Sequence, residues 1–427
     1  MPQDAASDQT TPSEMPLMEQ RQSVPPSRFA LWRNRDFMLL WGGQVVSNIG
    51  TQVSQLAFPL FILALTHSPA LAGLAGALRA LPYLLLSLPA GAMVDRWDRK
   101  RVMIICDVAR ALAMASIPLT FVLGYLTMLQ LFVVTTAEGT LFVFFNLAEV
   151  ACLPRVVPKQ LLPEAAAQNE ATFGITTLIG PLLGSLLYQI SNVIPFIGDA
   201  ISYACSVISL FFIKTGFQEP REATRHSLWQ GIYEGLHWLW TQPLIRFMAI
   251  LTGGLNLINA GYMLLVIVLA QEKHASSVII GLIFTIGSIG AIAGTIIGPF
   301  LQKRLRFGTA IISTVWLFAL CMPFFLIVPN VIMIGVVTAI ALVGGSIYNV
   351  VQLSYRSAMI PDALQGRVNS AFRLIAFGSI PLGTALTGLS IQDLGVARTI
   401  MIDSLILLVL ALAATLNTHV RHAQPIA

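Results

Sequence analysis

The amino-acid sequence predicts an all-α membrane protein of twelve transmembrane helices, arranged as two six-helix bundles that are related by a parallel repeat. Three observations lead to this fold class: the composition, a series of apolar runs of membrane-spanning length, and an internal repeat. Of the 427 residues, 56% are hydrophobic and only 11% are charged, whereas soluble globular proteins contain about 25% charged residues. The mean hydropathy is +0.77. This composition is typical of a protein that is embedded in a lipid bilayer.

The apolar runs have the length that a membrane helix needs. A spanning helix takes about 20 mostly apolar residues, because the hydrocarbon core is about 30 Å thick and each residue adds about 1.5 Å. The runs are too long and too uniformly apolar for the alternating strands of a membrane barrel. The predicted spans lie near 37–65, 71–91, 102–123, 127–151, 167–190 and 194–214, and then near 245–270, 277–300, 308–328, 331–354, 369–391 and 396–416.

Lysines and arginines favour one set of connections between these spans. Basic clusters lie before the first span and in every second connection after it, whereas the connections on the other side contain only Lys273 and Arg398. Short cytoplasmic loops of membrane proteins carry an excess of basic residues. We therefore expect both termini on the cytoplasmic side of the plasma membrane, the inner membrane of a bacterial-type cell. The formal net charge of +5 then reflects topology and not binding to nucleic acid.

The spans and connections divide the chain into five parts. The N-terminal residues are rich in Pro, Ser, Gln and acidic residues, which favours disorder. In the long central connection Leu228, Ile232 and Leu236 recur at helical spacing, which predicts an interfacial helix. The parts are a disordered cytoplasmic tail (1–28), an N-terminal six-helix bundle (29–215), a cytoplasmic linker with the interfacial helix (216–243), a C-terminal six-helix bundle (244–416) and a second cytoplasmic tail (417–427).

An internal repeat relates the two halves. At an offset of 203 residues, four polar or proline positions match in one register: Lys100 with Lys303, Arg101 with Arg304, Asn146 with Asn349 and Pro158 with Pro361. Each copy contains six spans, an even number, so both copies enter the membrane in the same direction. Such copies are related by an axis along the membrane normal, as in parallel-repeat transporters.

The connection between spans two and three carries the sharpest motif. A small residue that lets helices approach closes the span, an acid follows at the span end, and a basic turn comes next. A carboxylate beside guanidinium groups can form contacts in one conformation and lose them in another. We therefore predict a conformational latch, in which Glu149 at the end of span four meets Arg99 or Arg101. The latch residues are Gly91, Asp95, Arg96, Arg99, Lys100 and Glu149.

This connection resembles the signature of the major facilitator superfamily, Gly-x-x-x-Asp-Arg-x-x-Arg-Arg/Lys, which runs here from Gly91 to Lys100. Asp98 stands where the family usually has Gly, and in this respect the loop is similar to the branch of macrolide-efflux and enterobactin-exporter relatives. The run from Gly180 to Gly184 resembles the antiporter motif of drug exporters. The resemblance covers roughly residues 30–416. It implies alternating access, with proton-coupled efflux of amphipathic small molecules such as drugs, macrolides or siderophores.

Ionisable residues inside the spans are candidate functional residues, because each costs a few kcal/mol or more to hold in hydrocarbon. Arg79 and Glu138 lie about midway along spans two and four, and their shared depth predicts an ion pair. Two roles stay open: Glu138 carries a proton once solute displaces its partner, or the pair is permanent and structural. Asp107 and Arg110 lie one helical turn apart on span three and are expected to neutralise each other.

Polar residues on spans one, four, seven and ten are candidates for binding the solute. In the fold of the resembled family those spans line the central cavity, and bulky aromatic residues can add apolar surface to it. The predicted cavity residues are Asn48, Gln52, Asn146, Asn259, Tyr262 and Asn349.

Other classes of protein fit the sequence less well. There is no Gly-x-x-x-x-Gly-Lys-Ser/Thr phosphate loop, which argues against an ATP-driven pump. No His-Glu-x-x-His or Gly-x-Ser-x-Gly occurs, so we expect no enzyme, no cofactor and no metal site. A nutrient or metabolite importer of the same fold, or a non-transporting membrane scaffold, remains an alternative. The expected partners are a small-molecule solute, protons and the lipid bilayer, with the chain acting as a monomer.

Overall fold

The computed structural model describes residues 30–218 and 228–423, and over these ranges it consists of helices and connecting loops. The first half contains α1 (Ala30–Arg33), α2 (Arg35–Thr66), α3 (Pro69–Val94), α4 (Arg99–Val122), α5 (Met128–Val156), α6 (Leu162–Ile190) and α7 (Ile194–Phe212). The second half contains α8 (Leu228–Thr241), α9 (Pro243–Glu272), α10 (Ser277–Arg304), α11 (Phe307–Ile327), α12 (Val331–Met359), α13 (Gln365–Gly378), α14 (Ile380–Leu394), α15 (Val396–Leu416) and α16 (Thr418–Arg421).

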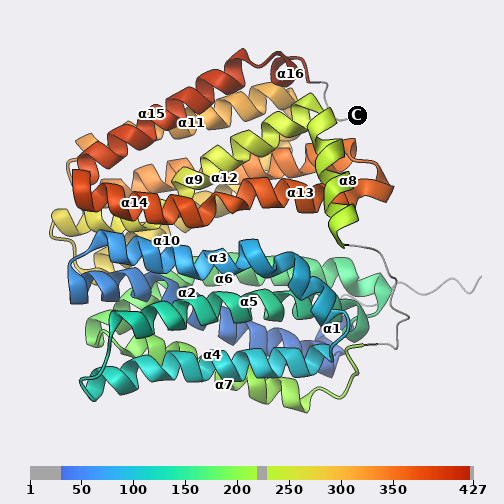
Figure 1. Cartoon of the computed structure of the whole chain (residues 1–427), viewed down its shortest axis with the longest axis vertical. Coiled ribbons are helices and arrows are strands. Elements are labelled where there is room, and N and C mark those ends of the chain that lie inside the picture. Colours follow the sequence, from blue (N-terminus) through green and yellow to red (C-terminus); the bar gives the residue numbers. More distant parts are fainter. Residues whose placement is uncertain (1–29, 219–227, 424–427) are drawn as a thin grey trace, which may run out of the picture.

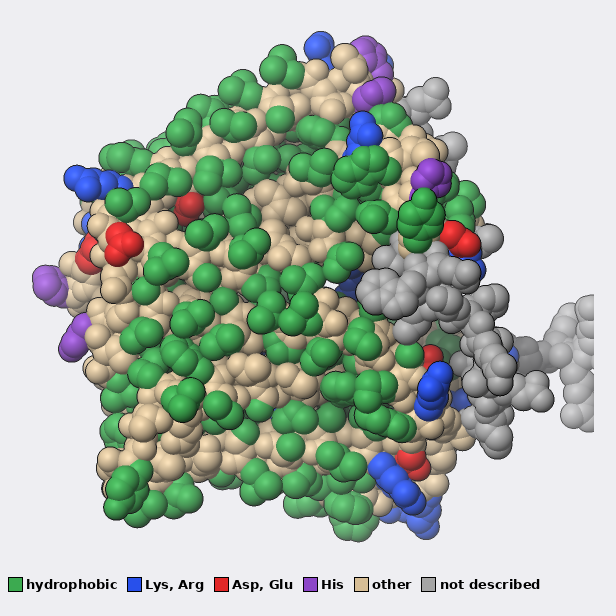
Figure 2. All heavy atoms as spheres, viewed as in Figure 1, with side chains coloured by type: hydrophobic (Ala, Val, Ile, Leu, Met, Phe, Trp, Pro, Cys, Tyr) green, Lys and Arg blue, Asp and Glu red, His purple; other side chains and the backbone are tan. Residues whose placement is uncertain are grey.

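The predicted fold class is confirmed. Within the described ranges, twelve helical segments are long and apolar enough to cross a membrane, and they form two six-helix bundles (Figure 1). Helices α1, α8 and α16 all lie at one end of the bundles. We call this end the linker side and the opposite end the far side. Hydrophobic side chains cover the face shown in Figure 2, while charged side chains gather toward the two ends, as expected for a protein surrounded by lipid.

The helices extend beyond the predicted apolar runs. Helix α5 continues to Val156 and α6 already begins at Leu162, because polar residues extend these helices past the hydrocarbon region that hydropathy detects. Span eleven was predicted as one helix over 369–391, but it is interrupted at Ser379, between α13 and α14. Pro381 explains the interruption, since proline has no backbone N–H to donate and its ring clashes with the carbonyl four residues earlier.

The central connection contains the predicted helix, which is α8. Its described side chains show one buried face: Leu239 is fully buried, whereas Tyr233 and Trp240 are exposed. Helix α8 packs on α9 and α13 of the second half, and Glu234 forms an ion pair with Arg367 of α13. The side chains of Leu228 and Ile232, like the predicted tail 1–28, lie outside the described residues.

The two bundles meet on the far side. Gln392 of α14 accepts from the Ala70 amide of α3 at 3.2 Å on this side, and Ser288 of α10 donates to the Thr177 carbonyl of α6 at 3.0 Å about midway along both helices. Toward the linker side, the described residues provide one hydrogen bond between the halves, which Arg373 of α13 donates to the Tyr83 hydroxyl of α3. The bundles are therefore tied more firmly on the far side than on the linker side.

Candidate functional site

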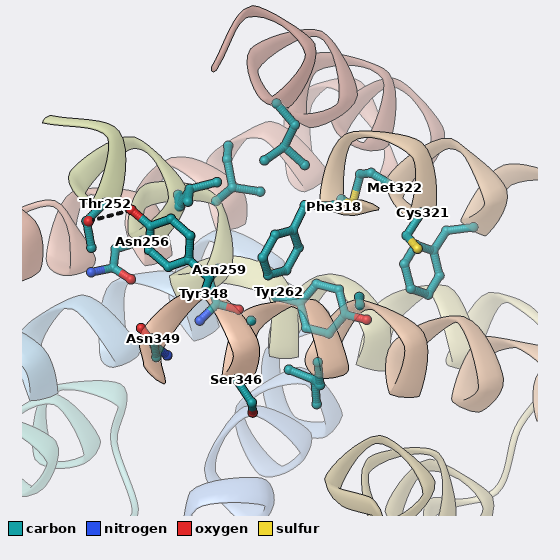
Figure 3. Close-up of a pocket in the computed structure, with 17 residues that line it drawn as sticks. Thr252, Asn256, Asn259, Tyr262, Phe318, Cys321, Met322, Ser346, Tyr348 and Asn349 are labelled. Carbon is teal, nitrogen blue, oxygen red and sulfur yellow. Dashed lines mark hydrogen bonds between the residues drawn. The ribbon is translucent and has the colours of Figure 1, made fainter. Parts of the chain in front are cut away.

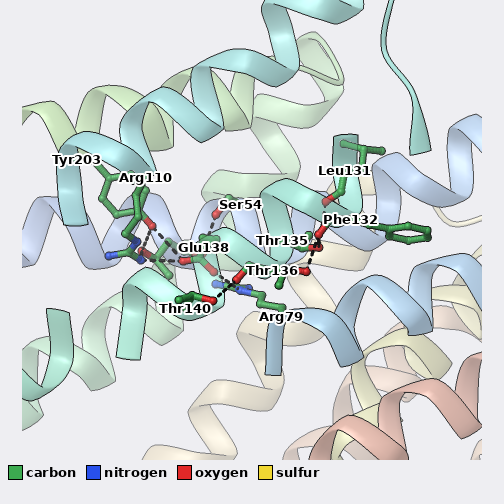
Figure 4. A network of polar contacts seen from close by, with 11 residues as sticks. Ser54, Arg79, Arg110, Leu131, Phe132, Thr135, Thr136, Glu138, Thr140 and Tyr203 are labelled. Carbon is green, nitrogen blue, oxygen red and sulfur yellow. Dashed lines mark hydrogen bonds and ion pairs between the residues drawn. The ribbon is translucent and has the colours of Figure 1, made fainter. Parts of the chain in front are cut away.

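A buried network of charges lies in the middle of the first half (Figure 4). Glu138 of α5 is 1% exposed and accepts hydrogen bonds from two guanidinium groups. Arg79 Nε of α3 donates to Oε2 at 2.6 Å, and Arg110 Nη2 of α4 donates to Oε1 at 2.8 Å. The Tyr203 hydroxyl of α7 lies 3.4 Å from the same Oε1. Three helices of the bundle thus direct donors at one carboxylate.

A glycine makes the Arg79–Glu138 contact possible. Gly139 follows Glu138 on α5, and a β-carbon built at Gly139 would lie 2.9 Å from the Arg79 carbonyl carbon and 3.3 Å from its α-carbon. Only glycine lets the α3 backbone approach so closely. The predicted Arg79–Glu138 pair therefore depends on Gly139 as well as on the shared depth of the two residues in the membrane.

Arg110 contacts Glu138 as well as Asp107, whereas the prediction paired it with Asp107 alone. Its neighbour on the same helix, Asp107, lies 3.5 Å from Nη1, but the shorter contact, at 2.8 Å, goes to Glu138. The guanidinium carbon lies 4.0 Å from the centre of the Tyr203 ring, and Thr51 of α2 hydrogen-bonds the Tyr203 hydroxyl at 2.9 Å. The prediction missed Tyr203 and Thr51, since nothing in the residue pattern marks a tyrosine or threonine as part of a charge network.

Two further buried acids accompany Glu138: Asp107 lies 3.5 Å from Arg110, and Asp199 interacts with the two arginines electrostatically, without a direct contact. Asp107 and Asp199 are both fully buried. Within the described ranges, neither carboxylate oxygen of Asp107 has a hydrogen-bond partner, and Oδ2 of Asp199 has none. Three buried acids thus stand against two arginines, of which Arg110 is 3% exposed and the Arg79 side chain 23%. The described residues contain no group of three His, Cys, Asp or Glu placed to hold a metal ion.

The second half encloses a cavity of about 150 Å³ between α9, α11, α12 and α15. The predicted residues Asn259, Tyr262 and Asn349 line it. Figure 3 shows the rings of Tyr262, Phe318 and Tyr348 around the same space. The cavity wall is therefore aromatic and carries neutral amide groups, with no charged side chain among the residues that line it.

Hydrogen bonds fix the polar groups of this wall. Tyr348 and Thr252 share a hydrogen bond of 2.8 Å, and Tyr262 donates to Thr338 at 3.0 Å. Asn256 donates Nδ2 to the Ala376 carbonyl at 2.7 Å. The prediction missed Asn256, although it lies one helical turn before Asn259 on α9, and that spacing was a usable signal.

The predicted cavity residues of the first half do not line this cavity. Gln52 of α2 instead donates Nε2 to Thr177 of α6 at 2.8 Å, which links two helices of its own bundle. Asn48 and Asn146 are half-buried and are absent from the cavity wall. Depth along a helix was predicted for these residues, whereas rotation about the helix axis decides which side chain meets the cavity.

The residues of the predicted latch contact one another and their own bundle. Arg99 Nη2 lies 3.2 Å from Asp95 Oδ1, and Arg99 Nη1 donates to the Ala151 carbonyl of α5 at 2.9 Å. Lys100 donates to the Ile213 carbonyl after α7 at 2.6 Å. These contacts pin the α3–α4 turn to its own bundle, while the Asp95 side chain stays 66% exposed and Arg96 is exposed.

Two expectations for the latch are wrong in this conformation. No hydrogen bond or ion pair joins the Glu149 side chain to Arg99 or Arg101 among the described residues, because Arg99 is held by Asp95 and by backbone carbonyls. A β-carbon at Gly91 would meet nothing within 4 Å, so no helix approaches closely there. The two halves instead approach each other closely at the other end of α3, on the far side.

Comparison with known proteins identifies relatives of the whole chain. The family of transmembrane secretion effectors matches residues 26–426. The multidrug efflux pump Tap of Mycolicibacterium fortuitum is 25% identical, over 90% of this chain and 96% of that protein. The enterobactin exporter EntS of Citrobacter koseri is 24% identical, over 82% and 84%. Macrolide efflux protein A of Streptococcus pyogenes is 24% identical, over 90% and 96%.

Solved structures of transporters share the fold. The nucleoside transporter NupG superposes with a TM-score of 0.72 at 12% identity, over 90% of this chain and 98% of that one. A bacterial homologue of the lysosomal transporter Spinster, in an inward-facing and unoccupied conformation, gives a TM-score of 0.71 at 12% identity, over 90% and 97%. At such identities the likeness shows the fold alone.

Proposed function

Since the chain belongs to the transmembrane secretion effector family of major facilitator superfamily transporters, we propose that it exports amphipathic small molecules in exchange for protons. Relatives over most of its length are named as a multidrug efflux pump, an enterobactin exporter and a macrolide efflux protein, which supports export. The observation that carries the proposal is the buried network of the first half, in which three acids face two arginines.

The way in which the bundles touch supports alternating access. The linker side carries most of the basic residues at span ends, and the far side carries Lys273 and Arg398, so we place the linker side in the cytoplasm. The far-side contacts then close the extracellular end, and this conformation faces inward. Solute enters from the cytoplasm, and rocking of the two bundles exposes it to the outside.

The charge balance of the network supports proton coupling. A buried cluster with three ionised acids and two arginines carries an uncompensated negative charge, which is costly in a low-dielectric interior. One bound proton makes the cluster neutral. When Glu138 takes that proton, its hold on Arg110 weakens, and Arg110 can then pair fully with Asp107, which already lies 3.5 Å away. The network thus has two arrangements that differ by one proton.

The groups that face this exchange come from every helix around Glu138. Arg79 belongs to α3, Arg110 and Asp107 to α4, and Tyr203 to α7. Thr51 of α2 hydrogen-bonds Tyr203 and lies 3.5 Å from Arg110. Because α3 also touches α14 of the other half, a rearrangement at Arg79 can be transmitted to the contact between the bundles. The chain carries out this cycle as a monomer.

Inside-out membrane vesicles test the proposal directly. Vesicles with the protein should accumulate ethidium or erythromycin when their lumen is made acidic, and nigericin, which collapses the pH gradient, should abolish the accumulation. Vesicles without the protein are the control. If none of these compounds accumulates, and neither a catecholate siderophore nor the aromatic carboxylate 1-naphthoate does so, while the protein is present and monodisperse, proton-driven export of amphipathic molecules is wrong.

A further inference from the structure

Arg356 is a buried arginine to which the described part of the chain offers no counter-charge. It lies in the last turn of α12, is 8% exposed, and makes no ion pair or side-chain hydrogen bond with the described residues. Its Nε has no partner, and its guanidinium carbon lies 4.0 Å from the centre of the Phe372 ring of α13. The buried arginines of the first half by contrast contact carboxylates: Arg110 contacts two and Arg99 contacts Asp95. A buried charge that lacks a partner is strongly unfavourable. An anion bound at Arg356 would offset this cost.

A second orphan donor lies one turn away on the same helix. Gln352 is 6% exposed and its Nε2 has no hydrogen-bond partner. Asn349, Gln352 and Arg356 follow the spacing i, i+3 and i+7, which places them on one face of α12. Since Asn349 lines the aromatic cavity, this face leads from the cavity to Arg356. The distance along the helix between Asn349 and Arg356 is about 10 Å.

A further positive charge lies near this face. Arg373 of α13 is close enough to interact electrostatically with Arg356, and it donates to the hydroxyl of Tyr83 instead of to a carboxylate. The acids of this region have other partners: Glu234 pairs with Arg367, and Asp362 accepts from Gln365 at 3.2 Å. No described acid therefore neutralises the two arginines.

We propose that Arg356 and Gln352 form a binding site for an oxyanion, a carboxylate or phosphate, carried by the solute whose aromatic part occupies the neighbouring cavity. The planar guanidinium matches the two oxygens of such a group, and the Gln352 amide adds one donor. Arg373 favours the approach of the anion from the linker side. The proposal rests on the proposed function, because it names the chemistry of the solute. A lipid phosphate offers the same chemistry from a different source.

Equilibrium binding tests the site without any transport step. The full chain is placed in nanodiscs of phosphatidylcholine, and binding of tritiated 1-naphthoate is compared with that of 1-naphthamide, its uncharged counterpart. We expect wild type to bind the carboxylate at least about 10-fold more tightly, as a charge-assisted contact implies. Arg356→Gln should remove this preference, and Arg356→Lys should retain part of it.

A matched control separates the site from general effects of charge. Arg304 lies in the last turn of α10 and stacks on Phe300 at 4.2 Å, but it is exposed. Arg304→Gln should leave both affinities unchanged. Size-exclusion profiles show whether each variant is folded, and we expect Arg356→Gln to fold at least as well as wild type, because it removes an unpaired buried charge.

Equal binding of the two probes, no binding of the carboxylate, or an unchanged preference in Arg356→Gln would overturn the site. Loss of naphthoate binding when phosphatidylglycerol is added to the nanodiscs would assign the anion to lipid and overturn the solute as its source. Failure of proton-driven accumulation in vesicles, with the carboxylate preference intact, would reject the proposed function and leave the site standing.

Discussion

Gly73 of α3 and Gly388 of α14 bring the two bundles into backbone contact on the far side. A β-carbon built on Gly73 would lie 2.8 Å from the Gly388 α-carbon, and one built on Gly388 would lie 2.9 Å from the Gly73 α-carbon. Real β-carbons do not approach that closely, and small residues are what permits such helix contacts in membranes. If the far side faces the exterior, this glycine pair closes the extracellular end.

Gly73→Ala should open the far side. Overpacking of a close contact costs about 1–3 kcal/mol, and about 1.4 kcal/mol changes a population tenfold, so the far-side-open population should rise by roughly an order of magnitude. The measurement is the distance between spin labels at Tyr125 and Asp393, both exposed, in protein whose exposed Cys205 has been replaced. The far-side distance distribution should shift to longer values.

Gly76→Ala is the matched control for this substitution. It lies one turn further along α3, and its β-carbon would meet Thr384 at 3.6 Å, an ordinary van der Waals contact. Gly76→Ala should therefore leave the distances unchanged. A distribution in Gly73→Ala identical to that of Gly76→Ala would show that the glycine contact does not control closure.

Arg110→Met should destabilise the protein more than Arg79→Met. Loss of Arg110 leaves Asp107 without any cation and Glu138 with one, which should cost about 3–5 kcal/mol. Loss of Arg79 still leaves Arg110 on Glu138, and the Arg79 side chain is 23% exposed, so about 1–2 kcal/mol is expected. Thermal unfolding in detergent compares them. Equal Tm values for the two variants would contradict the shared role of Arg110.

Asp95→Asn should slow transport with little effect on stability. The Asp95–Arg99 pair is exposed on the acid side and contributes well under about 1 kcal/mol, so Tm should barely change. We predict that the free part of the carboxylate meets α13 near Arg367 or Arg373 when the linker side closes, and removal of its charge should then reduce the transport rate roughly tenfold. Asp98→Asn is the control, because asparagine caps α4 as well as aspartate does. Normal transport by Asp95→Asn would reject the latch.

Tyr125 should be accessible from outside the cell, whereas the linker-side residue Arg306 should not. Both are exposed, and they lie at opposite ends of the bundles. Cysteine substitution at each, in a chain without Cys205, allows labelling of intact cells by a membrane-impermeant maleimide. Labelling at position 306 in intact cells, with no labelling at 125, would reverse the proposed orientation and with it the inward-facing assignment.

Much of the fold was predictable because it depends only on the position of each residue along the chain. Apolar length gives each span, and the offset between Lys100 and Lys303 gives the repeat. Depth in the membrane also predicts that Arg79 and Glu138 are neighbours, and the structure places them 2.6 Å apart. These properties require only the position of a residue along its helix.

The rest depends on how each helix is rotated and packed. The sequence could not show that Arg110 turns toward Glu138, or that Gln52 turns toward Thr177 and away from the cavity, because residues at one depth can face any direction. The orphan state of Arg356 is likewise a tertiary property. Its repeat mate is Leu153, so the repeat gives no hint of a charge at that position.

The most direct test of proton coupling is transport by Glu138→Gln in reconstituted vesicles with an imposed pH gradient. The solute is whichever of ethidium, erythromycin, the catecholate or 1-naphthoate wild type accumulates. Glutamine keeps the shape of Glu138 and can accept a hydrogen bond from one of the two arginines through its amide oxygen, but it cannot exchange a proton. We predict that Glu138→Gln still exchanges labelled for unlabelled solute across the membrane, but accumulates none against its gradient. Accumulation equal to that of wild type would show that Glu138 does not carry the proton.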